Sequence, residues 1–267
     1  HFAAWAAAHL RDDPVDLVVG FNKMPGLDVY YAADSCYVEK AHAQRPLAYR
    51  LLPRYRVLSE LEHAVFGEAS SALIMMIAPQ QKRFFQRHHA TPDARIVALP
   101  PGIAPQRVRA LRAARRSEAL RSELGLGADD RLLLFVGSGF VKKGLDRVVR
   151  GVAALPGALR RRTHVAVLGK DHPGPVARLA RRLGVRDRIH LLGGRDDVPE
   201  FMASAEAIVL PALDENAGMV ILEALFAGLP LLVTDVCGFA DHVRRADAGI
   251  VLPSPFSQPA FDGMEAL

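Results

Sequence analysis

The stretch DENAGMVILEALFAGLPLLVTD (residues 214–235) carries two glutamates, Glu215 and Glu223, on either side of a predicted helix start. Before it, AIVLPAL (207–213) reads as a buried strand, and GMVILEALFAG (218–228) has helical spacing with a glycine as its stop. Glu215 is therefore predicted in a strand-to-helix loop and Glu223 inside the helix. A buried strand, a short loop and a helix in this order predict one repeat of a parallel α/β sheet.

The same alternation extends outward from this stretch. From Arg131 onward, short apolar runs separated by amphipathic segments predict the strands RLLLFVG, THVAVLG, RIHLLGG, AIVLPAL, PLLVTD and GIVLP. Gly137 and Gly169 end two of them, at the sheet edge where parallel sheets bind ligands. The first half repeats the theme with three predicted strands, VDLVVGF (15–21), SALIMMIA (71–78) and ARIVALP (94–100). The sequence predicts an α/β protein of two doubly wound domains facing a cleft.

The predicted domains divide the chain unequally. Residues 1–104 form a partial N-terminal domain, 105–130 an Arg-rich connecting helix and linker that reaches about Gly127, and 131–267 a C-terminal domain. The chain starts in HFAAWAAAHLRDD, which has a helical pattern. We therefore expect a chain truncated at both ends, with the front of the first domain and the last helices of the second missing.

Composition excludes several classes of protein. The 267 residues are 50% hydrophobic, but no apolar run reaches the roughly 20 residues that span a bilayer. A formal charge of +5 suits an anionic partner, although no nucleic-acid-binding signature accompanies it. Cys36 and Cys237 lie far apart without metal-ligand spacing, which predicts two inert, buried thiols in a cytosolic protein.

The helix start between the two glutamates favours an anion. Asn216, Ala217, Gly218 and Met219 present backbone amides without intrahelical partners, and their small side chains allow close approach of a phosphate or sugar. Glu223, if it faces the sheet edge, can accept two ribose hydroxyls. The alternative is that both glutamates are solvated charges near a helix, which their spacing alone does not exclude.

Three motifs together resemble the retaining GT-B glycosyltransferases of glycosyltransferase family 4. The opening stretch is similar to the family's E-x7-E segment. VGSGFVKKGLDRVV (136–149) resembles its G-R-x4-K-G donor loop, with Lys143 at the lysine and Ser138 where the arginine usually is, so that Lys142 supplies charge there. LLGGRDDVPEFMASAEAIVLPA (191–212) is similar to its base-binding loop. The resemblance implies two Rossmann-like domains of the GT-B class.

The resemblance also implies a reaction. VVGFNKMPGLDVYYAADSCYVEK (18–40), YRLLPRYR and PPGI are similar to the branch of the family that moves glucose from UDP-glucose to a heptose of the lipopolysaccharide inner core, with retention of configuration. Lys143 and Glu215 are then the catalytic residues. The implied donor-binding residues are Gly137, Ser138, Lys142, Lys143, Arg195, Val198, Glu215, Asn216, Ala217, Gly218, Met219 and Glu223.

Neither a metal nor a cofactor is expected, because no D-x-D motif follows a suitable strand. The alternatives are a hydrolysing UDP-sugar epimerase of the same architecture or an inactive UDP-binding fragment. A Rossmann-type dinucleotide-binding module is disfavoured, since no G-x-G-x-x-G follows a strand.

The first domain supplies weaker candidates. Asn22 and Lys23, in the turn after the first strand, and Asp34 are possible sugar or acceptor contacts, although Pro25 and Gly26 explain the turn and Asp34 is also a good helix cap. His88 and His89 are assigned to a polar helix end, with no catalytic role.

Residues 41–66 raise a separate hypothesis. Leu47, Leu51, Tyr55, Leu58, Leu61 and Val65 follow helical spacing, and Pro53 divides the stretch into two short helices. A basic, aromatic, amphipathic segment can lie on an anionic leaflet, here through Arg45, Arg50, Arg54, Tyr55 and Arg56. This predicts a cytoplasmic protein, peripheral on the inner face of the cytoplasmic membrane; an ordinary helix that packs its leucines is the alternative.

Overall fold

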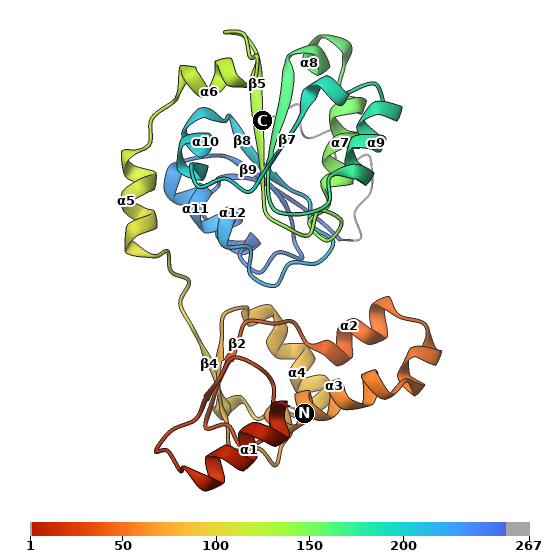
Figure 1. Cartoon of the computed structure of the whole chain (residues 1–267), viewed down its shortest axis with the longest axis vertical. Coiled ribbons are helices and arrows are strands. Elements are labelled where there is room, and N and C mark those ends of the chain that lie inside the picture. Colours follow the sequence, from red (N-terminus) through yellow and green to blue (C-terminus); the bar gives the residue numbers. More distant parts are fainter. Residues whose placement is uncertain (1, 255–267) are drawn as a thin grey trace. The chain divides into compact units, whose positions relative to one another are not determined.

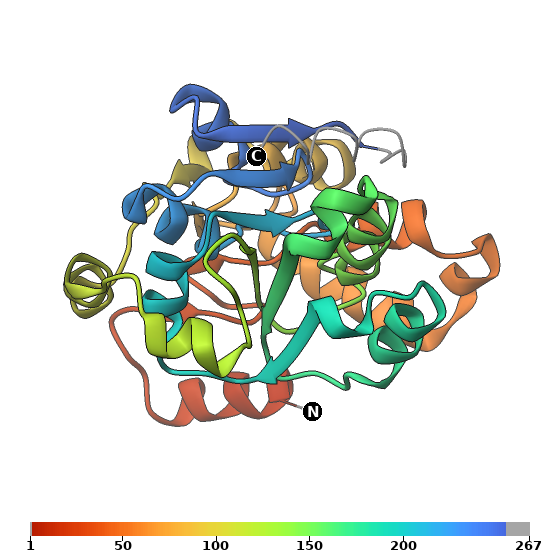
Figure 2. The ribbon, with the colours of Figure 1, turned by 90° about the horizontal axis from the view of Figure 1, so that it is seen from above.

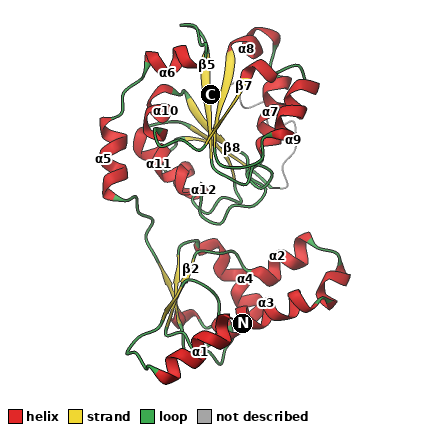
Figure 3. Cartoon of the chain, viewed as in Figure 1, coloured by secondary structure: helices red, strands yellow, loops and turns green. Residues whose placement is uncertain are grey.

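The chain forms two compact units, His1–Pro101 and Gly102–Leu267, in a computed structural model that describes residues 2–254. Helices and strands alternate in both units (Figures 1 and 3). Each unit is built on its own parallel sheet.

The first unit holds, within its described residues, a four-stranded sheet in the order β1-β2-β3-β4. Its elements are α1 (Phe2–Asp12), β1 (Val19–Gly20), β2 (Val29–Ala32), α2 (Tyr37–Gln44), η1 (Leu47–Leu51), α3 (Pro53–Phe66), β3 (Leu73–Met76), η2 (Pro79–Gln81), α4 (Lys82–His89), η3 (Asp93–Arg95) and β4 (Ile96–Ala98). The core brings together Tyr30 of β2, Ile74 of β3, Phe66 of α3 and Phe85 of α4. The Phe66 and Phe85 rings stack with centroids 3.7 Å apart.

The strand β2 corrects the three-strand prediction. Its sequence VYYA alternates half-buried and buried side chains, and both of its edges pair, Val29 with Val19 of β1 and with Leu73 of β3. Its sequence does not predict it, because four residues between two turns carry little periodic signal. The first predicted strand, 15–21, is shorter than expected, since only Val19 and Gly20 pair.

The second unit holds, among described residues, a six-stranded sheet in the order β10-β9-β8-β5-β6-β7. Its elements are α5 (Pro105–Ala113), α6 (Glu118–Glu123), β5 (Arg131–Val136), α7 (Leu145–Ala154), α8 (Gly157–Arg162), β6 (Thr163–Leu168), α9 (Gly174–Arg182), η4 (Arg186–Arg188), β7 (Ile189–Gly193), α10 (Val198–Ser204), β8 (Ala207–Leu210), α11 (Met219–Ala227), β9 (Leu231–Thr234), α12 (Ala240–Arg245) and β10 (Gly249–Leu252). All six predicted strands are confirmed. Figure 2 shows them in a row from β10 (dark blue) to β7 (teal).

Helices cover both faces of this sheet. Figure 1 shows α7, α8 and α9 on one face and α10, α11 and α12 on the other. The strands β6 and β8 are buried along their whole length, as parallel strands between two helical layers are. The predicted Arg-rich connecting helix is wrong in detail: it is two helices, α5 and α6, because Ala114 at the end of α5 is extended and Ser117 caps a new helix.

Residues 41–66, which we call the basic segment, consist of short elements. Helix α3 begins at Pro53, which confirms the predicted division, and α2 and η1 precede it. Within residues 2–254, no helix combines the length and apolar character needed to cross a bilayer.

Candidate functional site

The strand order of the second unit reverses between β5 and β8. Strand β5 has β6 on one side and β8 on the other, and crevices at such switch points bind ligands in open parallel sheets. The loop 137–144 follows β5, and the loop 211–218 follows β8. The Leu213 N–H donates to the Lys142 carbonyl at 2.8 Å, and Arg147 donates to the Pro211 carbonyl at 2.9 Å. Two predicted donor segments, far apart in the sequence, thus lie side by side.

The charges of these two loops meet. Lys143 forms an ion pair with Glu215, and Lys142 lies 3.3 Å from an Asp214 carboxylate oxygen. The side chains of Lys143 and Glu215 are 20% and 17% exposed, so both stay within reach of solvent. The structure therefore brings together the two residues predicted as catalytic.

Close backbone approach supports this pairing. Gly144 has φ +74°, and a Cβ there would overlap the Pro211 carbonyl oxygen. Only glycine therefore allows the two loops to approach so closely. Gly218, with φ +81°, ends the second loop at the start of α11 and caps it without a side-chain hydrogen bond. Ala217 beside it is buried, and its carbonyl accepts the Phe239 N–H at 3.0 Å.

Glu223 has a partner that the sequence analysis missed. Arg107 of α5 donates to it at 2.7 Å, and α5 packs on α11. Glu223 therefore points toward α5, with its charge compensated across two helices. Arg107 and Glu223 are 116 residues apart, so no local sequence pattern indicates that they pair.

Three other predicted donor-site residues, Ser138, Arg195 and Val198, form no hydrogen bond or ion pair with the Lys143–Glu215 pair in the part of the chain that the structure describes. The Ser138 hydroxyl accepts the Lys170 N–H at 3.0 Å, which holds the loop after β5 against the one after β6. Arg195 donates to both carboxylate oxygens of Asp197, at 2.9 and 2.7 Å. These bonds, with a further one to Glu123, raise the pKa of Arg195 above its ordinary value. Val198 is the first residue of α10 and is buried.

A buried carboxylate organises the first unit. Glu62 of α3 is fully buried, and its Oε1 accepts Lys23 Nζ at 2.6 Å and the Tyr37 N–H at 2.8 Å. Its Oε2 accepts the Val38 N–H at 3.0 Å and lies 3.0 Å from His89 Nε2. We call this carboxylate and its donors the Glu62 hub. The loop after β1, the start of α2 and the end of α4 all meet there.

Glu62 is not among the predicted site residues, although its place in the sequence carries a signal. Leu58, Glu62 and Val65 share one helical face, and a carboxylate in an apolar stripe requires a buried partner. His89 is likewise not on a polar helix end as predicted, because it is 5% exposed and turned toward Glu62. His88, by contrast, pairs with Glu39 at 2.6 Å.

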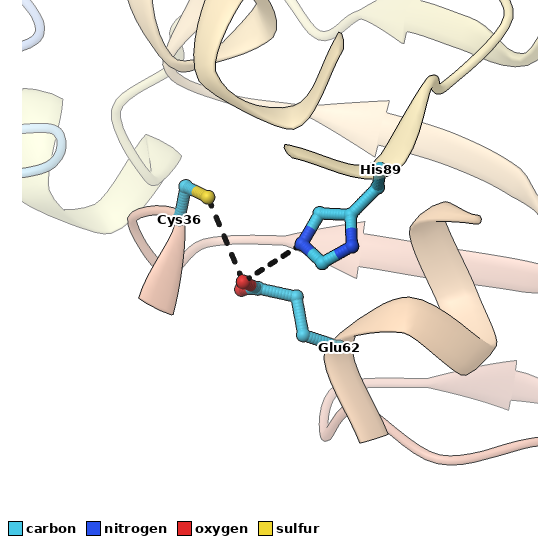
Figure 4. Close-up of side chains that lie close together, drawn as sticks. All are labelled: Cys36, Glu62 and His89. Carbon is cyan, nitrogen blue, oxygen red and sulfur yellow. Dashed lines mark hydrogen bonds and ion pairs between the residues drawn. The ribbon is translucent and has the colours of Figure 1, made fainter. Parts of the chain in front are cut away.

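Cys36, Glu62 and His89 have the chemistry of metal ligands, and their ligand atoms lie within 4.8 Å of one another (Figure 4). Burial raises the pKa of Cys36 to about 12, so that a protonated thiol faces the carboxylate at 3.6 Å. Both oxygens of Glu62 already accept backbone N–H groups. We interpret the cluster as a hydrogen-bonded hub. Cys237 is also a free, buried thiol, so the predicted burial is confirmed for both cysteines.

A pocket of about 970 Å³ lies in the first unit beside the hub. Asn22, Lys23 and Asp34, the three predicted sugar or acceptor contacts, all line it. Further lining residues include Ser35, Tyr37, Lys40, Gln44, Arg45, Tyr49, Arg54, Leu58 and Leu61. The structure thus gathers the weaker candidates into one polar and aromatic cavity.

The basic segment exposes its first apolar residues. Leu47 is 74% and Leu51 87% exposed, whereas Val65 is fully buried. Leu47 and Leu51 therefore do not pack as the ordinary-helix alternative expects, whereas the half-buried Leu58 and Leu61 and the buried Val65 do.

Comparison with known proteins points to one family. The description "Glycosyl transferases group 1" matches residues 116–265. Over 257 residues the chain is 45% identical to the lipopolysaccharide glucosyltransferase WaaG of Escherichia coli K12, which covers 96% of this chain and 69% of that protein. A D-inositol 3-phosphate glycosyltransferase of Streptomyces scabiei is 29% identical over 270 residues, which cover 93% of this chain and 58% of that protein.

Solved structures give the same result for the fold. A crystal structure of WaaG matches with a TM-score of 0.91 and 44% identity, over 98% of this chain and 70% of that one. Anabaena HepE in complex with UDP-glucose matches with a TM-score of 0.73 over 99% of this chain and 71% of that one, at 17% identity, which shows the fold alone. The predicted GT-B class, with two Rossmann-like units, is confirmed.

The Glu62 hub predicts a pH-dependent stability. Burial alone raises the pKa of Glu62, but bonds from His89 and Lys23 outweigh it and lower the pKa from 4.5 to about 2. The stabilisation is therefore present above pH 4.5 and is lost as pH falls toward 2. Glu62→Gln should lower the free energy of unfolding by about 3–5 kcal/mol at pH 7, and by less near pH 3.

Urea denaturation at both pH values measures this difference. Glu60→Gln is the matched control on the same helix: Glu60 pairs with Arg56 at the surface and is 60% exposed, so a loss of about 0.5 kcal/mol or less is expected. Equal losses in the two variants would contradict the hub.

Proposed function

This chain belongs to the glycosyl transferases of group 1, and we propose that it transfers glucose from UDP-glucose to a heptose of the lipopolysaccharide inner core, with retention of configuration. The name of WaaG, 45% identical over nearly the whole chain, supports glucose as the sugar and lipopolysaccharide as the acceptor. UDP as the carrier follows from the donor-loop and base-loop motifs. The chain spans 69% of the length of WaaG, and the proposal concerns the whole enzyme.

The meeting of Lys143 with Glu215 at the β5–β8 switch point carries the proposal. A cation that faces a carboxylate, beside the uncapped start of α11, suits a site that must hold a diphosphate. Lys143 can exchange its carboxylate partner for phosphate oxygens, and Glu215 is then free to accept hydroxyls of the sugar. Lys142 adds positive charge at the same loop.

The proposed reaction requires electrostatic stabilisation of the departing UDP. In the proposed reaction, the acceptor hydroxyl oxygen forms a bond to the anomeric carbon on the face from which the diphosphate leaves. The bond from that carbon to the phosphate oxygen breaks, UDP departs with the electron pair, and the departing phosphate takes the hydroxyl proton. Lys143, Lys142 and the amides near Met219 would stabilise the charge that develops on UDP, at roughly 3–4 kcal/mol for a preorganised donor. No metal or cofactor is required in this scheme.

The pocket of the first unit is the proposed acceptor site. Asn22 and Asp34 offer hydrogen bonds to sugar hydroxyls, and Tyr37 and Tyr49, whose hydroxyls lie 3.0 Å apart, offer aromatic surface. Lys23 is held in the wall of this pocket by the Glu62 hub.

The basic segment is the proposed membrane contact. Exposed Leu47 and Leu51 lie among Arg45, Arg50, Arg54 and Arg56, and Tyr55 is half-buried beside them. Apolar side chains next to arginines suit an anionic bilayer surface. The proposed location is the cytoplasmic face of the inner membrane, where a lipid-anchored acceptor remains.

A transfer assay tests the reaction. Incubation with UDP-glucose and a lipopolysaccharide core that ends in heptose should release UDP and add one hexose mass to the acceptor, as read by mass spectrometry. Release of UDP without acceptor, or epimerised free sugar, would instead assign a hydrolysing epimerase. Binding of UDP without any turnover would assign the inactive fragment.

The assignment of Lys143 predicts a selective loss of affinity. Lys143→Ala should weaken UDP binding about 10- to 100-fold, since a hydrogen bond to a charged group contributes about 1.5–3 kcal/mol, and should leave uridine binding nearly unchanged. Arg107 bonds only Oε2 of Glu223, which leaves Oε1 to accept a ribose hydroxyl in the proposed complex, so Glu223→Ala should weaken both ligands. Calorimetry measures the four affinities, with Lys82→Ala, a surface ion pair of the first unit, as control. Equal losses of UDP and uridine in Lys143→Ala would exclude a contact with the diphosphate.

Membrane association predicts dependence on lipid charge and salt. Sedimentation with vesicles should require anionic lipid and weaken as salt rises, because the surface potential is screened over roughly 10 Å at 0.1 M. Replacement of Arg45, Arg50, Arg54 and Arg56 by Gln should reduce binding strongly, since each contributes about 1 kcal/mol. Equal binding to neutral vesicles, or an unchanged four-Gln variant, would reject the proposal.

A further inference from the structure

The four arginines of the basic segment fall into two pairs with different surroundings. Arg45 and Arg54 line the pocket of the first unit, and Arg50 and Arg56 do not. We propose that Arg45 and Arg54 form an anion-binding site that recognises a phosphate or carboxylate group carried on the acceptor sugar. This inference rests on the proposed function in so far as it names the acceptor as the ligand.

The lining of the pocket has an excess of positive charge. Arg45, Arg54 and Lys40 line it together with a single carboxylate, that of Asp34, and the charge of a further lining residue, Lys23, is compensated by Glu62. A concave site lined by one sign of charge concentrates the field and attracts ligands of the opposite sign. A neutral sugar acceptor would not require this excess.

The cations differ in how their charge is compensated. Lys23 is neutralised at 2.6 Å by the buried Glu62 and serves as a fixed wall. Arg45 and Arg54 form no ion pair with a described carboxylate, and the Arg45 guanidinium lies over the Tyr49 ring at 5.5 Å. A guanidinium stacked on an aromatic ring keeps its planar fork available for a bidentate bond to phosphate or carboxylate.

The other pair points to a different role. Arg56 is 81% exposed and pairs with Glu60 one turn later on α3 at 2.8 Å. Arg50 is exposed on η1, between Leu47 and the highly exposed Leu51. These surroundings fit a surface contact, whereas Arg45 and Arg54 share their pocket with Leu58, Leu61 and tyrosines that can cover the face of a sugar ring.

The charged pocket is tested by calorimetry on the full chain with three probes: glucose 6-phosphate, glucuronate and glucose. Saturating UDP is present throughout, so that the donor site does not contribute to phosphate binding. The unmodified chain should bind one or both anions at least tenfold more tightly than glucose. Binding of glucose 6-phosphate alone assigns a phosphate, and binding of glucuronate alone assigns a carboxylate.

Two double variants distinguish the arginines that line the pocket from those that do not. Arg45→Gln/Arg54→Gln should weaken the anions about tenfold or more, whereas the matched Arg50→Gln/Arg56→Gln, with the same change in charge, should weaken them less than twofold. All four side chains are exposed, so both variants should keep the melting temperature of the unmodified chain. Equal losses in the two variants, or glucose bound as tightly as the anions, would overturn the inference.

The outcome is distinguishable from a failure of the proposed function. If anion binding depends on Arg45 and Arg54 but no heptose acceptor is glucosylated, only the reaction is wrong. If glucosylation occurs and the Arg45→Gln/Arg54→Gln variant has the unmodified KM for acceptor in detergent, the anion site is wrong.

Discussion

Burial of the Glu62 charge is the constraint on which the first unit depends. A carboxylate without exposed surface is strongly unfavourable unless charged and hydrogen-bonding partners surround it. These partners come from Lys23 after β1, from the amides of Tyr37 and Val38 at the start of α2, and from His89 at the end of α4. Compensation of one charge thus fixes three segments relative to α3, and two of these segments contribute to the lining of the pocket.

The second unit also contains an ion pair between distant segments, but this pair is less buried than the Glu62 hub. Its central ion pair, Lys143 with Glu215, also links segments distant in the sequence, but both side chains keep some exposure to solvent. A partly solvated pair can exchange a partner for a ligand at modest cost, whereas breaking a fully buried pair leaves a charge without compensation. This contrast suits a structural role for Glu62 and a ligand-binding role for Lys143.

The basic segment combines two properties that its sequence presents as one. Arg45 and Arg54 line the pocket and Arg50 and Arg56 do not; Arg54 and Arg56 differ because two positions along α3 place them on opposite sides of that helix. One stretch can therefore serve both an acceptor pocket and a bilayer surface. The apolar side chains divide in the same way, since Leu51 is exposed and Leu61 lines the pocket.

The sequence alone determined the α/β class, all six strands of the second unit and the two loops that carry Lys143 and Glu215. These follow from local periodicity and glycine punctuation, which act within about ten residues. Only the tertiary structure decided that Arg107 compensates Glu223, that Glu62 gathers Lys23 and His89, and which arginines enter the pocket. The physical reason is that a buried charge is compensated by whichever donor the fold brings near, at any separation along the chain. The tertiary structure also decided strand β2. Pairing with two neighbouring strands stabilises its four residues, whose own pattern is too short to predict a strand.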